Sequence, residues 1–308
     1  MEQKEPIRPG RTEVAPIRLL VLDIDGTIAD EAGYIRDSVA QAIHSAQRRG
    51  VAVAIATGRG FQLSLPAHDS IGSSLPLICY EGALVKEPNT GCLHRHWFLA
   101  RRAAEQVLHH TEQLSLSGRL SVHFHVDDTL YVSNLNSAAI KYFEGSEIEP
   151  IVVSDLRPKL NRAITKVRVV SDDAGLITWL YNQLQNAHGR TRLKQYKSLT
   201  FLEVDHPAVN KRLAVSYLAE NFMGLLPENV MAIGDNFSDI EMLQYAGTGV
   251  AMGNAPMAVK AFSDWVTTTI EEDGVARAIE QWILRARFSA EPALRIVSSK
   301  RTHQARAR

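Results

Sequence analysis

The sequence predicts an α/β fold: a doubly wound, mostly parallel, Rossmann-like sheet with a smaller α+β module inserted into it. Short apolar runs at residues 19–22, 51–56 and 229–233 lack polar alternation, which is typical of strands buried on both faces of a parallel sheet. Helical patterns separate these runs, so strands and helices alternate along the chain. Residues 88–194 differ, because strand-like and helical patterns occur there in similar measure without a buried parallel run.

The first strand, Leu19–Leu22, stops at two aspartates, Asp23 and Asp25, which are followed by Gly26 and Thr27. Side chains two residues apart on a strand point to the same side, so both carboxylates leave the carboxyl end of the strand together, where open α/β sheets bind ligands. Neighbouring carboxylates repel each other unless a cation lies close, and Mg²⁺ is the usual solution. An acidic turn without a ligand is the alternative for this stretch alone.

The elements that follow continue the same pattern. Residues 35–49 keep apolar side chains at helical spacing, and Gly50 stands where a glycine commonly ends a helix. The second strand is followed by Thr57 and Gly58, where a hydroxyl and backbone amides at the start of a helix form an anion site. After another helix, a third strand is predicted over residues 75–80.

The doubly wound pattern resumes after the inserted module. A helix predicted over residues 210–220 begins near Lys211, whose ammonium group could serve as a point charge for phosphate. The next strand ends in a loop that carries a second pair of carboxylates, Asp235 and Asp239, with Ser238 between them. Two aspartate pairs, a hydroxyl and a lysine are what phosphoryl transfer from a monoester requires: a nucleophile, a proton donor, a metal site and positive charge.

The chain resembles the haloacid dehalogenase superfamily of phosphatases, and within it the Cof-type, subclass IIB hydrolases. The resemblance rests on Leu22–Thr27, Ala56–Arg59, Lys211 at the start of a helix and Ile233–Asp239, in this order and spacing. It covers residues 17–285. Each motif is weak alone, whereas the four in this order are a specific signal.

The spacing of these motifs indicates where a cap domain is inserted. Only one helix and one strand fit between the first two motifs, whereas the stretch from Thr57 to Lys211 is far longer than one crossover needs. The resemblance therefore implies a type-two cap, and the α+β texture suits its B form, C2B. The predicted division is a disordered lead-in over residues 1–16, a core over 17–87 and 195–285, a cap over 88–194 and a basic tail over 286–308.

The resemblance also implies a role for each carboxylate. Asp23 would attack phosphorus and form an aspartyl-phosphate, while Asp25 would protonate the leaving group and then accept a proton from water. Mg²⁺ would be held by Asp23, Asp235 and Asp25, the last through its backbone carbonyl. Asp239 would support this metal site from close by.

Four further residues would bind the phosphate of the substrate: Thr57, Gly58, Lys211 and Ser238. The chain departs from the family at two positions. Ser238 stands where the family usually has asparagine, and a serine is shorter but still donates a hydrogen bond. Glu81 stands where the family tends to have asparagine, and an extra carboxylate near an anion site is unfavourable unless it points to the cap or to solvent.

The leading functional hypothesis is a Mg²⁺-dependent phosphomonoesterase that acts on small phosphorylated metabolites, such as sugar phosphates, a flavin-precursor phosphate or pyridoxal phosphate. A phosphotransferase or mutase of the phosphomannomutase type is an alternative, because it uses the same aspartyl-phosphate. A non-catalytic phosphate-binding protein on the same scaffold is a third possibility, but it would be expected to lack at least one of Asp23, Asp25, Lys211 and Asp235, and all four are present.

Composition excludes several other classes of partner. The chain has 308 residues with 34 basic and 34 acidic side chains, so its overall charge indicates neither a nucleic acid nor a membrane surface. Its 2 cysteines cannot form a disulfide framework, and no apolar run approaches the length of a membrane span. These observations predict a cytoplasmic protein, either a monomer or a homodimer.

Overall fold

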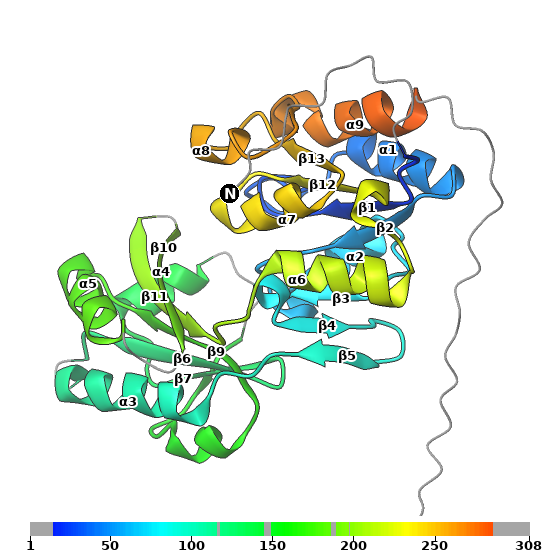
Figure 1. Ribbon diagram of the computed structural model, residues 1–308. Coiled ribbons are helices and arrows are strands. Elements are labelled where there is room, and N and C mark those ends of the chain that lie inside the picture. Colours follow the sequence, from blue (N-terminus) through cyan, green and yellow to red (C-terminus); the bar gives the residue numbers. More distant parts are fainter. Residues whose placement is uncertain (1–14, 116–117, 145–148, 186–188, 197, 286–308) are drawn as a thin grey trace, which may run out of the picture.

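A computed structural model of the chain describes residues 15–115, 118–144, 149–185, 189–196 and 198–285. The predicted basic tail and all but the last two residues of the predicted lead-in lie outside these residues. The described chain forms a core with helices on both sides of a sheet and a separate cap with its own sheet (Figure 1). Within the described residues, no helix is both long and apolar enough to span a bilayer.

The core is built on a five-stranded, entirely parallel sheet in the order β14-β13-β12-β1-β2. Its strands are β1 (Leu19–Leu22), β2 (Ala52–Ile55), β12 (Val230–Gly234), β13 (Thr248–Ala251) and β14 (Trp265–Val266). The chain moves from β1 to β2 on one side and later returns to β12 on the other side, so the strand order reverses at β1. The predicted doubly wound parallel sheet is confirmed, and a reversal of this kind leaves a crevice at the carboxyl ends of the strands.

Helices cover both faces of this sheet because its strands are apolar on both sides. Leu20 and Leu22 pack toward one group of helices, whereas Leu19 and Val21 pack toward the other, as the alternation of a strand requires. All four side chains are fully buried, and each contributes about 1.5–3 kcal/mol of hydrophobic stabilisation. One face is covered by α1 (Asp37–Arg48), α2 (Phe61–Ser70) and α9 (Gly274–Ile279), and the other by α6 (Lys211–Ser216), α7 (Ile240–Tyr245) and α8 (Met257–Lys260).

A three-stranded antiparallel sheet extends the core toward the cap. It consists of β3 (Leu77–Cys79), β4 (Leu84–Lys86) and β5 (Leu93–His96). A single parallel bridge between Ala56 and Ile78 connects its first strand to the residue that follows β2. The loop after β3 therefore begins beside the loop after β2, at the same edge of the core.

The cap has a six-stranded sheet in the order β10-β11-β9-β6-β7-β8. Its strands are β6 (Ser121–Val126), β7 (Thr129–Val132), β8 (Ile151–Val152), β9 (Ile164–Val170), β10 (Arg190–Tyr196) and β11 (Leu199–Asp205). Its helices are α3 (Arg101–Ser115), α4 (Ser137–Phe143) and α5 (Ala174–Gln183). Helices α3 and α5 pack on one face of the sheet, and α4 packs in a smaller cluster with β9 and β11. The predicted α+β texture of the insert is confirmed.

The cap continues further along the chain than the sequence predicted. The core was expected to resume at residue 195, but β11 pairs with both β10 and β9 and so belongs to the cap sheet. That boundary is therefore too early. Several positions of β10 and β11 carry charged side chains, a pattern that is not typical of buried strands. Only the pairing shows that Lys194 and Glu203 lie on one face and neutralise each other.

Candidate active site

The predicted site residues meet at the carboxyl ends of β12, β1 and β2. Lys211, the first residue of α6, lies at the centre of this group. Its Nζ donates to Asp23 Oδ1 over 2.7 Å and to Asp239 Oδ1 over 2.6 Å. All three side chains are buried. The structure thus joins the first, third and fourth sequence motifs through one ammonium group.

The loop after β12 is held by Asp239. Asp239 Oδ2 accepts hydrogen bonds from the backbone N–H groups of Asp235 over 3.0 Å and Asn236 over 2.9 Å. Gly234 is needed for this arrangement, because a Cβ atom there would lie 2.6 Å from the Asp239 side chain. Since Asp239 already bonds two amides and Lys211, it orders the loop and the lysine.

Asp235 lies against the loop that follows β1. Its Oδ1 accepts a hydrogen bond from Thr27 Oγ1 over 3.2 Å. Gly26 has φ +77°, and a Cβ atom on it would lie 2.4 Å from Asp235 Oδ2, so only glycine fits here. Asn254 Nδ2 donates to the Gly26 carbonyl over 2.8 Å, which fixes the turn from a third loop. No role was assigned to Asn254 from the sequence.

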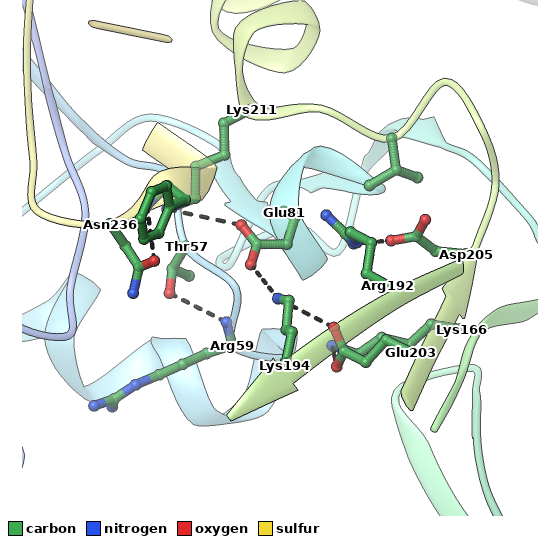
Figure 2. A network of polar contacts seen from close by, with 12 residues as sticks. Thr57, Arg59, Glu81, Lys166, Arg192, Lys194, Glu203, Asp205, Lys211 and Asn236 are labelled. Atoms are coloured by element: carbon green, nitrogen blue, oxygen red, sulfur yellow. Dashed lines mark hydrogen bonds and ion pairs between the residues drawn. The ribbon is translucent and has the colours of Figure 1, made fainter. Parts of the chain in front are cut away.

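Thr57 and Gly58 lie in the loop that follows β2, on another side of the site. Thr57 is fully buried, and its Oγ1 accepts a hydrogen bond from the backbone N–H of Arg59 over 3.1 Å. A Cβ atom on Gly58 would lie 2.8 Å from Glu81 Oε1, so the Glu81 carboxylate lies directly against this loop. Figure 2 shows Thr57, Glu81 and Lys211 around the same space.

Asp25 and Ser238 lie at the rim of the site. The guanidinium group of Arg59 binds the Asp25 carboxylate through two nitrogens, with Nε at 3.0 Å from Oδ2 and an Nη at 2.5 Å from Oδ1. The Asp25 side chain is 60% exposed, in contrast to the buried Asp23. Ser238 is half-buried in the short turn Phe237–Asp239. The ion pair of Arg59 with Asp25 was not predicted, because distances across loops cannot be read from spacing.

The buried charges of the site are not balanced by Lys211 alone. Burial raises the pKa of Asp23, and the neighbouring Asp239 and Asp235 raise it further, although Lys211 lowers it. Burial and Asp239 also raise the pKa of Asp235 to about 7. Although burial opposes it, the surrounding carboxylates raise the pKa of Lys211 and keep it protonated. One ammonium group thus faces several carboxylates, which leaves an excess of negative charge.

This excess fits a divalent cation. One carboxylate oxygen from each of Asp23, Asp235 and Asp239 lies within 4.8 Å of the other two. Carboxylate oxygens are the donors that hard divalent cations prefer, and a cation would favour the ionised form of each acid. Asp239 is already engaged by Lys211 and two amides, so Asp23 and Asp235 are the side chains suited to direct ligation.

The raised pKa of Asp235 predicts pH-dependent metal binding. In the metal-free protein the Asp235 carboxyl has a pKa of about 7, well above its ordinary value of 3.8. This protonation contributes stability at pH values below the ordinary pKa, and the contribution is lost as the pH rises to about 7. Metal binding requires the anion, so below about pH 7 the affinity for Mg²⁺ is expected to fall about tenfold for each pH unit.

Isothermal titration calorimetry with Mg²⁺ from about pH 5.5 to about pH 8 tests this expectation. The variant Asp235→Asn is the control, because it should bind Mg²⁺ weakly and lose the part of the pH dependence that Asp235 causes. A Mg²⁺ affinity that is the same in the wild type at both ends of the range would contradict the prediction.

Comparisons with known proteins identify the family of the chain. A profile of the haloacid dehalogenase-like hydrolases matches residues 20–279. The chain is 30% identical to YcsE of Bacillus subtilis, a 5-amino-6-(5-phospho-D-ribitylamino)uracil phosphatase. The alignment spans 272 residues and covers 88% of this chain and 98% of YcsE. It is 26% identical to YitU, a Bacillus subtilis protein of the same activity, over 86% of this chain and 97% of the relative.

Solved structures agree as well. A haloacid dehalogenase-like hydrolase from Bacteroides thetaiotaomicron superimposes with a TM-score of 0.74 at 26% identity, over 86% of this chain and 99% of that one. A structure from Thermotoga maritima has a TM-score of 0.75 at 25% identity, over 89% and 98% of the two chains. The chain belongs to the haloacid dehalogenase-like hydrolases and is a phosphatase of subclass IIB of that superfamily.

Proposed function

We propose that the protein is a Mg²⁺-dependent phosphomonoesterase that hydrolyses small phosphorylated metabolites through an aspartyl-phosphate intermediate. The observation that carries this proposal is the contact of the Lys211 ammonium group with both Asp23 and Asp239, beside Asp235. This arrangement lies at the switch point of a parallel sheet, which is where such sheets bind ligands. Hydrolases of this family typically use a divalent metal, and these carboxylates are suited to hold one.

In the proposed reaction, Asp23 Oδ forms a bond to phosphorus while the ester P–O bond breaks. Asp25 gives its proton to the departing alkoxide. A water molecule then attacks the phosphorus of the aspartyl-phosphate and loses a proton to Asp25, and the bond between phosphorus and Asp23 breaks to release inorganic phosphate. For Asp25 to face the leaving group, its contact with Arg59 has to open, which the exposure of Asp25 permits.

Charge neutralisation would supply much of the acceleration. Lys211 is positioned to bind an oxygen of the transferred group, and Thr57, the Gly58 amide and Ser238 would hold the others. Mg²⁺, held by Asp23, Asp235 and the Asp25 carbonyl, would add positive charge next to these oxygens. Removing a preorganised charge of this kind typically costs about 10²–10³-fold in rate.

The relatives suggest which substrates to test first. YcsE and YitU are named as phosphatases of 5-amino-6-(5-phospho-D-ribitylamino)uracil, so this flavin-precursor phosphate is the first candidate. Sugar monophosphates and pyridoxal phosphate are the other two classes expected from the sequence. The cap contributes Lys194, which contacts Glu81 of the core, and we expect the cap side chains near this contact to influence which candidate is hydrolysed.

A screen of these phosphates for release of inorganic phosphate tests the proposal. Release is expected with Mg²⁺, should stop when a chelator removes the metal, and should return when Mg²⁺ is added in excess. Glucose and mannose phosphates should be followed by chromatography as well, because isomer formation without phosphate release would indicate a mutase instead. Phosphate release that persists at full rate in the chelator would contradict the Mg²⁺ dependence. The predicted cytoplasmic location and the oligomeric state stay predictions.

A further inference from the structure

Glu81 adopts a backbone conformation that is rare for its residue type. It has φ +59°, and the preceding Tyr80 has φ +52°, so two consecutive non-glycine residues lie in the left-handed region. Asparagine and glycine tolerate this region far better than glutamate does. Strained backbone of this kind persists only where the surroundings fix it, and it gathers at functional sites.

The backbone of this segment is fixed against the phosphate-binding loop. The N–H of Glu81 donates to the Thr57 carbonyl over 2.9 Å, and the N–H of Tyr80 donates to the Arg59 carbonyl over 2.9 Å. The Glu81 carboxylate lies against Gly58, with Oε2 at 3.9 Å from Lys211 Nζ. A displacement of Glu81 would therefore change the position of the Thr57–Arg59 loop and of Lys211, which are expected to hold the phosphate.

The cap supplies the partner that this carboxylate needs. Lys194, on strand β10 of the cap, places its Nζ 2.7 Å from Glu81 Oε1 and 3.1 Å from Glu203 Oε2. Glu203 is buried and also binds Lys166 over 3.0 Å and Arg168 over 2.5 Å. Lys194 is thus held between a core carboxylate and a cap carboxylate, as Figure 2 shows.

These contacts form a continuous line of alternating charge across the two domains. It runs from Asp23 through Lys211, Glu81 and Lys194 to Glu203. Although burial by itself would raise it, Lys194 and Lys211 lower the pKa of the Glu81 carboxyl to about 2, so this acid is ionised at neutral pH. Without the cap lysine, this buried anion would depend on the more distant Lys211, at 3.9 Å.

We propose that Glu81 and Lys194 form the ion pair that sets the closed position of the cap over the proposed active site, and that both are positioning residues for the proposed hydrolysis. The effect on KM that we expect rests on the proposed function, whereas the role of the ion pair in holding the cap does not. Opening the pair would move β10 away and admit substrate. Closing it would exclude water and bring the cap strand against the leaving group.

The test compares Glu81→Gln, Lys194→Met, the double variant and a matched control. Arg157→Gln is the control, because Arg157 forms exposed ion pairs with Glu112 and Asp155 on the cap surface, away from the core. Each single variant is expected to raise KM for an aryl phosphate by about five- to tenfold, and the double variant by no more than the worse single variant. The control should match the wild type.

Hydrogen exchange of β10 separates this inference from the proposed function. Glu81→Gln and Lys194→Met should speed amide exchange over residues 190–196 equally, and the double variant no more than either. Hydrogen exchange can be measured on an inactive protein. If the wild type releases no phosphate, the proposed hydrolysis is refuted, and hydrogen exchange still tests the ion pair. Additive effects, or β10 exchange unchanged from the wild type, would overturn the ion-pair inference.

Glu81→Asn distinguishes the charge from the backbone strain. Asparagine tolerates the left-handed conformation, so this variant should unfold at a higher temperature than Glu81→Gln. It lacks the charge, so its KM should be raised as much as that of Glu81→Gln. A Glu81→Asn variant with the wild-type KM would show that the carboxylate does not position the cap.

Discussion

Replacing Asp23 with asparagine is expected to abolish phosphate release. The amide is nearly isosteric with the carboxylate, but it is not a nucleophile and cannot form the aspartyl-phosphate. The rate should fall by about 10⁴-fold or more, as it does when a covalent catalyst loses its nucleophile. Malachite-green detection of released phosphate from the best substrate of the screen measures this loss.

The same substitution should leave the fold intact. Lys211 keeps its hydrogen bond to Asp239, and the removal of one buried negative charge relieves repulsion from Asp235 and Asp239. We therefore expect a free energy of unfolding within about 1 kcal/mol of the wild type when no metal is present. A folded Asp23→Asn variant that keeps its rate would show that another residue is the nucleophile.

Replacing Lys211 with methionine is expected to cause the largest loss of stability. The lysine is buried and forms ion pairs with Asp23 and Asp239, so its removal leaves two buried carboxylates without their cation. Breaking a buried ion pair by removing one partner costs about 3–5 kcal/mol. Chemical unfolding followed by circular dichroism measures this loss. Activity should fall as well, because the transferred phosphate loses its point charge.

The way in which the stability loss of Lys211→Met depends on pH and Mg²⁺ identifies its cause. Without Lys211, the carboxylates can relieve their repulsion only by binding protons or a cation, so the loss should be larger at about pH 8 than at about pH 5. Saturating Mg²⁺ should recover part of it. Lys141→Met, at an exposed position of α4, is the control and should change stability by less than about 0.5 kcal/mol. Equal losses at both pH values, with no effect of Mg²⁺, would indicate lost packing instead.

Much of the core could be predicted because its strands are buried on both faces. The short uninterrupted apolar runs at β1, β2 and β12 are typical of a parallel sheet, and the polar residues that follow them mark the carboxyl ends. The meeting of Asp23 with Asp235 followed from the rule that parallel strands end at one edge, whereas Lys211 follows a cap strand and was assigned to the site through the resemblance. Nothing in local propensity was needed for this step.

The cap was less predictable because its sheet carries charges on one face. Strand β11 is buried although it carries Glu203, because Lys194 of the partly exposed β10 and Lys166 of β9 neutralise this carboxylate. Partners of this kind lie on different strands, and their register depends on pairing that spans the whole cap. The contact of Arg59 with Asp25 could not be predicted for the same reason, because the two residues lie on different loops.

The fold class, the inserted cap, and the acids and the lysine of the site could be inferred from the sequence alone. These features depend on periodicity and on the order of motifs, which are local properties of the chain. The direction of the Glu81 carboxylate and the lysines that neutralise it could be seen only in the folded chain. The reason is physical: the charge state of a buried group depends on neighbours within a few ångströms, and folding brings those neighbours from distant parts of the chain.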